Sequence, residues 1–177
     1  MAGRIAVVDS QDSFLRWAER KEVHARRLVH RSVHVLVFDR AGRLLVQRRH
    51  PDKDVYPGHW DTSCAGHVEE SDYPGGPNQG LDGVYAAVAA RELGEELGVQ
   101  ADLEELGHFA PVPNVHYEQI RLFRAVHDGP FVLQAGEVSA VRPVTRPEFL
   151  GLQAIGAPVT PSLIWFVDWL HATGLWE

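Results

Sequence analysis

The chain has 177 residues, of which 45% are hydrophobic, a net charge of −7 at pH 7 and a single cysteine. This length suits one globular domain with a full hydrophobic core. The lone cysteine excludes an internal disulfide bond, the start of the chain lacks a signal-peptide pattern, and no apolar run reaches membrane-spanning length. We therefore expect a cytoplasmic protein that does not contact a membrane.

The charge is unevenly distributed along the chain. Residues 1–50 carry 11 Lys and Arg against 5 Asp and Glu, whereas residues 51–177 carry 6 against 19. A basic segment beside an acidic site would suit a phosphate-bearing small molecule, and an uneven solvated surface would give the same counts. Because the basic residues are scattered and the chain is acidic overall, nucleic acid is not expected as a partner.

The first fifty residues predict apolar strands separated by turns. In chain order we expect an apolar run at 5–8, a turn at 9–13, a partly helical segment at 14–28, and strands at 33–38 and 43–49. Residues 39–42 form a tight turn, so the last two strands make a hairpin. We treat residues 1–30 as an N-terminal extension.

Two arginines end this hairpin. Arg48 and Arg49 are adjacent, so they point to opposite faces of the strand. Either is a candidate for contact with a substrate phosphate, because a guanidinium group matches phosphate oxygens, and either could equally be a solvated strand end.

The middle of the chain leads from a short strand to a charged helix. Residues 60–63 are expected to form a strand that runs into Gly66. Residues 71–81 are rich in Pro and Gly and do not suit regular structure, so we expect either a lid or a disordered loop. A helix follows at about 82–97, capped by Asp82 and ended by Gly98.

This helix has an apolar stripe and an acidic face. The stripe comprises Ala86, Ala90, Leu93 and Leu97. Glu92, Glu95 and Glu96 share one arc of the remaining face, where their charges repel one another. A hard divalent cation such as Mg²⁺ or Mn²⁺ would relieve this repulsion, while a solvated acidic face is the plainer interpretation.

The last third of the chain predicts more strands and two helices. Strands are expected at 106–112, 118–126 and 138–144, a short helix opens at the capping box 145–148, and a last helix runs from Thr160-Pro161 to near Gly174. The aromatic last helix suggests core packing or a homodimer contact. This order of elements indicates an α+β fold or mixed-sheet sandwich.

Residues 66–99 resemble the Nudix box, which reads Gly, five residues, Glu, seven residues, then Arg-Glu-apolar-x-Glu-Glu-x-Gly-apolar. Residues 91–99 match the second half at every position, and Gly66 matches the opening glycine. Eleven extra residues separate Gly66 from Arg91. Counting back from Arg91 places the first glutamate at Gly83, so that carboxylate is missing or is supplied by a neighbour. The candidates for this role are Glu69, Glu70, Asp72 and Asp82.

The resemblance implies a single Nudix domain over residues 1–177, an α/β/α sandwich around a mixed sheet. It also implies a Mg²⁺- or Mn²⁺-dependent pyrophosphohydrolase that cleaves a nucleoside diphosphate-linked or related small molecule. Glu95 and Glu96 would bind metal, and Glu92 would bind metal or take the proton of the attacking water. Arg91 would hold these glutamates in position.

Two further metal ligands follow from the same resemblance. The backbone carbonyl of Gly66 commonly completes the site in this family. A further carboxylate often comes from a later strand, and Glu118, at the start of the strand 118–126, is the candidate here.

Other segments resemble the branch of Nudix proteins related to isopentenyl-diphosphate isomerase. These segments are Val23-His24, residues 28–35, residues 45–49, and Tyr56-Pro57-Gly58 before Trp60-Asp61. With the box they cover about two thirds of the chain. The resemblance implies a second hypothesis, in which the protein isomerises an allylic diphosphate without hydrolysis.

In that isomerase, histidines and acidic residues gather one metal ion. The matching residues here are His24, His30, His67 and Glu118, with His116 in place of an acidic ligand. Such a set would suit Zn, Mn or Fe. The reactive cysteine of the isomerase is replaced by Ala65, and Cys64, one residue earlier, points to the other face of its strand. This departure and the intact second half of the box favour hydrolysis. A third reading is a non-catalytic, nucleotide-binding Nudix domain.

Overall fold

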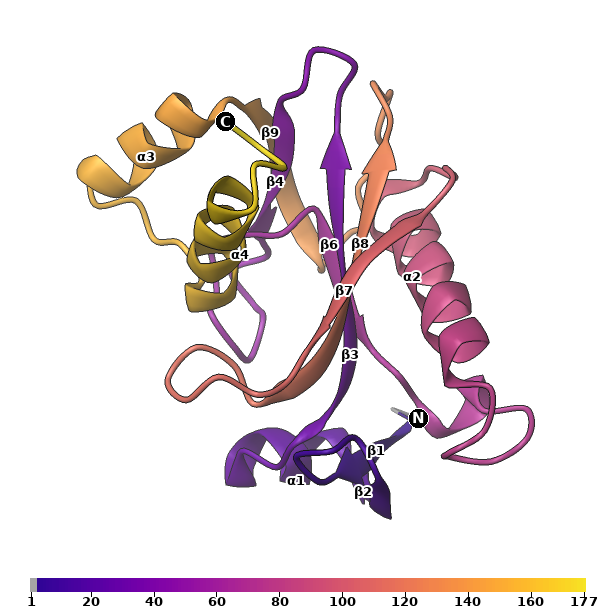
Figure 1. Cartoon of the computed structure of the whole chain (residues 1–177). Helices are drawn as coiled ribbons and strands as arrows, with labels where there is room; N and C mark the ends of the chain where they lie inside the picture. The colour runs from indigo at the N-terminus through magenta and orange to yellow at the C-terminus, as the bar shows by residue number, and fades with distance from the viewer. Residues whose placement is uncertain (1–2) are drawn as a thin grey trace.

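A central strand, β3, organises the sheet in the computed structural model, which describes residues 3–177 (Figure 1). The nine strands are β1 (Arg4–Val8), β2 (Phe14–Glu19), β3 (His30–Phe38), β4 (Leu44–Arg49), β5 (Trp60–Asp61), β6 (Cys64–His67), β7 (Glu104–Phe109), β8 (Glu118–Val126) and β9 (Val138–Val144). The helices are α1 (Arg20–Arg26), the 3₁₀ turn η1 (Glu70–Asp72), α2 (Leu81–Leu97), α3 (Arg146–Ala154) and α4 (Pro161–Ala172). The predicted α+β fold with a mixed sheet is confirmed.

Strand β3 is buried at every position because elements cover both of its faces. It pairs in parallel with β8, with His30 opposite Glu118, and antiparallel with β6, with Val33 opposite Gly66. Odd-numbered residues such as Val33 face the core beneath α2, and Leu36 and Phe38 face the core beneath α3 and α4. Helices therefore lie on both sides of the sheet (Figure 1).

Helix α2 begins and packs differently from the prediction. It starts after Gly80, which adopts a left-handed conformation, so the predicted Asp82 cap is wrong, whereas the predicted stop at Gly98 is confirmed. The predicted stripe is also partly wrong, because Ala86 and Ala90 are exposed. The buried residues of α2 are Val84, Tyr85, Val88, Ala89, Glu92, Leu93, Glu96 and Leu97. This rotation buries larger apolar side chains than two alanines and thus removes more apolar area from water.

Several other boundaries differ in ways that strand pairing explains. The segment expected to be partly helical divides into β2, which pairs with β1, and the short helix α1. The strand expected at 106–112 is shifted to β7, because its partner β8 fixes the register. Strands β8 and β9 have the predicted bounds, and both halves of the capping box at Thr145 and Glu148 are formed.

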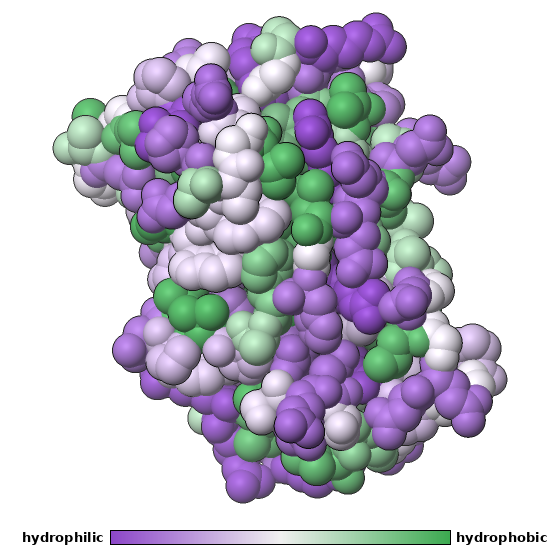
Figure 2. All heavy atoms as spheres, in the orientation of Figure 1, coloured by the Kyte–Doolittle hydropathy of each residue, from purple (hydrophilic) through white to green (hydrophobic). Residues whose placement is uncertain are grey.

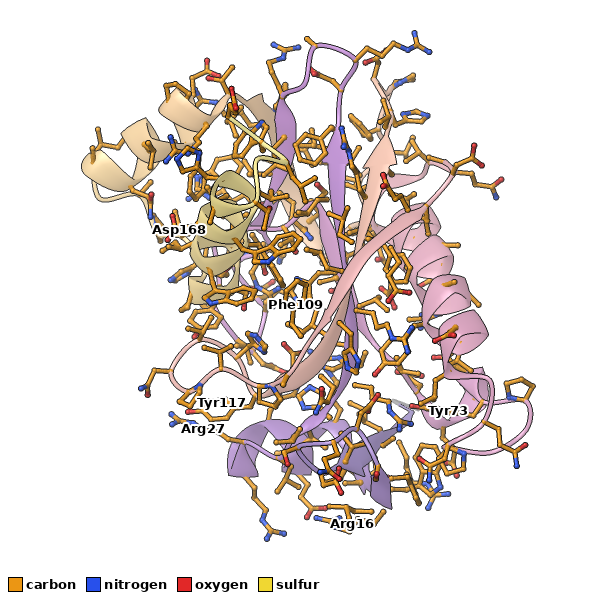
Figure 3. The ribbon with its side chains drawn as sticks, in the orientation of Figure 1. Arg16, Arg27, Tyr73, Phe109, Tyr117 and Asp168 are labelled. Carbon is orange, nitrogen blue, oxygen red and sulfur yellow. The ribbon has the colours of Figure 1, made fainter. Side chains whose placement is uncertain are left out.

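The Pro/Gly-rich insertion is packed against the N-terminal hairpin. Arg31, fully buried, donates to Asp12 Oδ1 at 2.6 Å, to the Tyr73 hydroxyl at 3.3 Å and to the Pro77 carbonyl oxygen. Asn78 accepts a hydrogen bond from the backbone N–H of Phe14 at 3.0 Å. The insertion thus lies at the end of the molecule that carries β1 and β2, where Figure 3 labels Tyr73.

The surface is mixed in character. No helix in the described part of the chain combines the length and apolarity needed to cross a membrane. On the face drawn in Figure 2, apolar residues form several small groups separated by polar ones.

Candidate functional site

A cavity of about 760 Å³ opens where α1, β3, β6, α2 and the start of α4 meet. This volume is in the range of small-molecule sites. Seven carboxylates line it, namely Asp61, Glu69, Glu92, Glu95, Glu96, Glu118 and Glu137. Four basic side chains line it as well, namely Arg20, Arg27, Arg49 and Lys53. No residue of the range 71–81 lines it, so the insertion does not form its lid in this structure.

One wall of the cavity is formed where β6 meets α2. A Cβ built on Gly66 would lie 2.0 Å from Cδ of Glu92, so the Glu92 side chain can occupy this position only because residue 66 is glycine. Arg91 lies 2.9 Å from a Glu92 oxygen and 3.2 Å from a Glu95 oxygen. Glu96 accepts a hydrogen bond from Gln47 Nε2 at 2.8 Å. The three predicted glutamates therefore line one cavity.

Two of these glutamates are buried and the third is exposed. Burial raises the pKa of Glu92 to about 7, against the opposing charge of Arg91, and raises that of Glu96 to about 8. A bound divalent cation would favour the charged form of both groups, so these donors fit Mg²⁺ or Mn²⁺. The ligand atoms of these three carboxylates do not all lie within 4.8 Å of one another. Among the described residues, the one group that meets this distance is His30, His67 and Glu118.

Asp72 occupies the place of the missing first carboxylate of the box. It is the sixth residue after Gly66, where counting forward from the glycine puts the acidic position. Its Oδ2 accepts a hydrogen bond from Arg91 at 3.3 Å and also caps η1 through the backbone N–H of Glu69 at 2.8 Å. Asp82 instead pairs with Arg121 at 2.6 Å. Asp72 therefore contacts Arg91 whereas Asp82 does not, which makes Asp72 the better placed of the two for the first carboxylate of the box.

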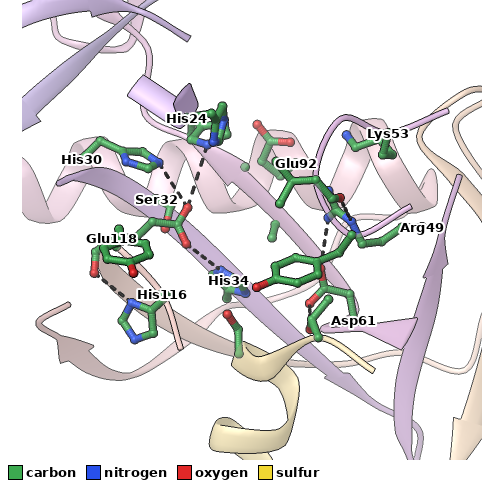
Figure 4. A pocket seen from close by; sticks show the side chains of 18 of the residues that line it. His24, His30, Ser32, His34, Arg49, Lys53, Asp61, Glu92, His116 and Glu118 are labelled. Carbon is green, nitrogen blue, oxygen red and sulfur yellow. Dashed lines mark hydrogen bonds and ion pairs between the residues drawn. The ribbon is translucent and has the colours of Figure 1, made fainter. Parts of the chain in front are cut away.

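The opposite wall carries a cluster of histidines around Glu118 (Figure 4). Ligand atoms of His30, His67 and Glu118 all lie within 4.8 Å of one another. The ring nitrogens of His30 and His67 stand 3.3 and 3.9 Å from Glu118 Oε1. The His24 ring packs against that of His67 with centroids 5.0 Å apart. The structure therefore brings three members of the alternative metal set together, and leaves His24 and His116 outside this three-residue group.

The charge states of this cluster suit metal ligation. Burial lowers the pKa of His24 to about 4 and that of His67 well below its usual value. Burial alone would raise the pKa of Glu118, but hydrogen bonds with His30 and His34 hold it well below its usual value. Nε2 of His24 is buried without a hydrogen-bond partner. Neutral imidazoles and an ionised carboxylate are the donor forms that a transition metal needs.

The two arginines at the end of β4 have different environments. Arg49 lines the cavity with Lys53, and its Nη1 lies 3.0 Å from Asp61 Oδ2. Arg48 does not line the cavity and donates to the Gly58 carbonyl at 3.1 Å. Arg49 is therefore the better placed of the two for a substrate phosphate.

The only cysteine faces away from the cavity. Cys64 is fully buried in the core beneath α2, and burial raises the pKa of its thiol. Ala65 lines the cavity in its place. The cavity lining thus holds no thiol.

Sequence reasoning missed several polar residues that line the cavity. They are Ser32, His34, Lys53, Thr160 and Ser162. A signal was available for two of them, because His30, Ser32 and His34 alternate along a strand that is otherwise mostly apolar.

Comparisons with known proteins agree with this geometry. A model of the NUDIX domain matches residues 28–163. An uncharacterised Nudix hydrolase of Pseudomonas aeruginosa is 41% identical over 159 residues, covering 89% of this chain and 87% of that protein. An isopentenyl-diphosphate Delta-isomerase of Burkholderia multivorans is 29% identical over 180 residues, covering 99% of this chain and 95% of that protein. A crystal structure from Deinococcus radiodurans shares the fold, with a TM-score of 0.79 at 22% identity over 93% of this chain and 97% of that one.

Proposed function

This chain belongs to the Nudix family, and we propose that it is a divalent-metal-dependent pyrophosphohydrolase of a diphosphate-linked small molecule, nucleoside diphosphate derivatives included. The observation that carries the proposal is the wall where Gly66 packs on Glu92 beside Arg91 and Glu96. More carboxylates than basic groups line this cavity, so an anionic diphosphate would be repelled unless a cation accompanied it.

The glutamates of α2 would hold the cation. We assign Glu95 and Glu96 as ligands, with Glu92 and the Gly66 carbonyl as further donors. Glu118, the other predicted ligand, lies on the opposite wall with His30 and His67, and would reach the same cation only from across the cavity. When bound, Mg²⁺ or Mn²⁺ would neutralise phosphate charge and lower the pKa of a coordinated water.

The chain's own residues supply orientation and proton transfer. Arg91 bridges Asp72, Glu92 and Glu95, and thereby positions the glutamates. Glu92 lines the cavity beside Arg91, and its carboxylate would accept the proton of the attacking water. Arg49 and Lys53 line the same cavity and would contact the phosphates.

The test is a hydrolysis screen with Mg²⁺ or Mn²⁺. The panel contains nucleotide sugars, dinucleotides, coenzyme A and nucleoside di- and triphosphates, and released phosphate or nucleotide is measured. Glu95→Gln and Glu96→Gln should each lower turnover of any accepted substrate at least about a hundredfold. Glu104→Gln, at an exposed position of β7, is the matched control. Turnover that is unchanged in both site variants would reject the assignment.

A second candidate function rests on the grouping of His30, His67 and Glu118. We propose that this group binds Zn, Mn or Fe, with His24 beside it. An isomerase acting on isopentenyl diphosphate would use such a site, but Ala65 and the buried Cys64 leave the cavity without the thiol which that chemistry needs. Incubation with isopentenyl diphosphate separates the two functions, since an isomerase forms the dimethylallyl isomer and a hydrolase releases phosphate. Nucleotide binding without any turnover would instead indicate a non-catalytic domain.

A further inference from the structure

A set of buried polar side chains lines the cavity beyond the histidine group. We call Ser32, His116 and Ser162 the polar wall; all three are at least nine-tenths buried and line the cavity. Figure 4 shows Ser32 and His116 on the side of Glu118, across the cavity from Glu92, Arg49 and Lys53.

The position of Ser32 on β3 makes its polarity costly. Ser32 shares a strand face with Leu36 and Phe38, and the adjacent strand places Ile120 beside it in register. Leu36, Phe38 and Ile120 belong to the core beneath α3 and α4. An apolar residue at position 32 would extend this core, whereas a buried hydroxyl needs a hydrogen-bond partner to offset its desolvation.

Two atoms of the polar wall have no partner in the described protein. These atoms are Ser32 Oγ and His116 Nε2. The other ring nitrogen of His116, Nδ1, bonds to the backbone carbonyl of Glu118 at 3.1 Å, so it carries the proton and leaves Nε2 as an acceptor. A serine hydroxyl both donates and accepts. Together they present the donor and acceptor pattern that pairs with alcohol groups.

We propose that the organic group of the substrate is hydroxylated, as in a sugar or polyol diphosphate, and that its hydroxyls bind Ser32 and His116. The inference rests on the proposed function, which places the diphosphate near Arg49, Lys53 and the glutamates of α2. A hydrocarbon group in the same position would leave both buried polar atoms unpaired, which disfavours its binding.

The experiment compares simple diphosphate monoesters on the unaltered protein with Mg²⁺. The hydroxylated probes are glycerol diphosphate and glucose 1-diphosphate, and the apolar probes are butyl and isopentenyl diphosphate. We expect kcat/KM for the hydroxylated esters to be at least about tenfold higher, which corresponds to one retained hydrogen bond. Equal or higher kcat/KM for the apolar esters overturns the inference, and this comparison needs no variant that might misfold.

Variants then assign the preference to the polar wall. Ser32→Ala and His116→Leu should each lower kcat/KM for the hydroxylated esters about tenfold and leave the apolar esters within about twofold. His171→Leu, exposed on α4, is the control. An equal loss for both classes of ester would show a merely structural role and overturn the assignment.

The outcome also separates this inference from the proposed function. The hydrolysis screen described above decides the proposed function separately. If none of the four esters is hydrolysed, calorimetric titration with the same esters decides the inference. Tighter binding of the hydroxylated esters would support it, and equal or weaker binding would overturn it.

Discussion

Gly66 and Glu92 lie so close that any side chain at position 66 would require Glu92 to move. A Cβ there would stand 2.0 Å from Cδ and 2.2 Å from Oε1 of Glu92, distances that no pair of non-bonded atoms tolerates. The contact joins β6 to α2 at the wall where the buried glutamates lie. The opening glycine of the box thus has a steric role in addition to any role of its carbonyl.

The first prediction concerns this contact. Gly66→Ala should displace Glu92 and lower metal-dependent turnover at least about tenfold, with a loss of roughly 1–3 kcal/mol in the free energy of unfolding, because overpacking forces a shift. Urea denaturation and initial rates measure the two effects. Gly83→Ala is the control, since a Cβ there meets nothing within 4 Å and should stabilise the helix by about 0.5–1 kcal/mol. Full activity of Gly66→Ala would contradict the steric argument.

The second prediction concerns the carboxylate that replaces the first glutamate of the box. Asp72→Asn keeps the cap on η1 but removes the charge beside Arg91, so we expect turnover to fall about tenfold or more, as for groups that orient metal ligands. Asp82→Asn, whose partner is Arg121, should leave turnover within about twofold. Steady-state rates of the two variants, measured side by side, test the assignment, and a larger effect at Asp82 would reverse it.

The third prediction concerns pH and stability of the metal-free protein. Above the ordinary carboxyl pKa of 4.5, the folded protein still holds protons on Glu92 and Glu96 that the unfolded chain has lost. The lowered pKa values of His24, His67 and His116 have the opposite effect, but only a small part of that effect remains above pH 6.5, and it ends by about pH 7.5. The free energy of unfolding should therefore fall by roughly 1–3 kcal/mol between pH 6.5 and about 8.5.

Urea denaturation in the presence of EDTA measures this dependence. Glu96→Gln removes the larger of the two contributions and should flatten the curve. Mg²⁺ should raise stability more at the alkaline end, where both carboxylates are charged. A stability that rises with pH across this interval would show that the two carboxyls are already ionised in the folded protein.

The fourth prediction concerns the buried ion pair that anchors the insertion. Arg31→Met leaves Asp12 without its cation and should lower the free energy of unfolding by about 3–5 kcal/mol. It should also expose residues 74–79 to limited proteolysis, because Arg31 contacts Tyr73 and Pro77. Arg16→Ala, which breaks an exposed pair with Glu22, should change neither property measurably. Resistance of Arg31→Met to protease would show that other contacts hold the insertion.

Local sequence patterns predict most of the fold, and the elements that were predicted wrongly depend on tertiary packing. Apolar runs and turn residues locate β3, β4, β8 and β9, and the capping box locates α3. The division of residues 14–26 into β2 and α1 depends on pairing with β1, which no local pattern reveals. Helix α2 is rotated relative to its predicted stripe because Val84 and Val88 bury more area than Ala86 and Ala90.

The candidate site could also be predicted only in part from the sequence. Spacing within one helix places Glu92, Glu95 and Glu96, and these residues do line the cavity. The contact between Arg91 and Asp72 depends on the path of the inserted residues, which counting along the sequence does not reveal. The grouping of His30, His67 and Glu118 depends on the register of β3 against β6 and β8, which only the assembled sheet supplies.

The contact between Arg31 and Asp12 bears on where the chain can be shortened. The family match begins at residue 28, so a truncation at that point would look reasonable from homology alone. It would leave a guanidinium group in the protein interior without its carboxylate, and would also delete α1, which brings Arg20 and His24 to the cavity. Residues 4–27 are therefore integral to the architecture of this chain, and deletions intended to improve crystallisation or expression should spare them.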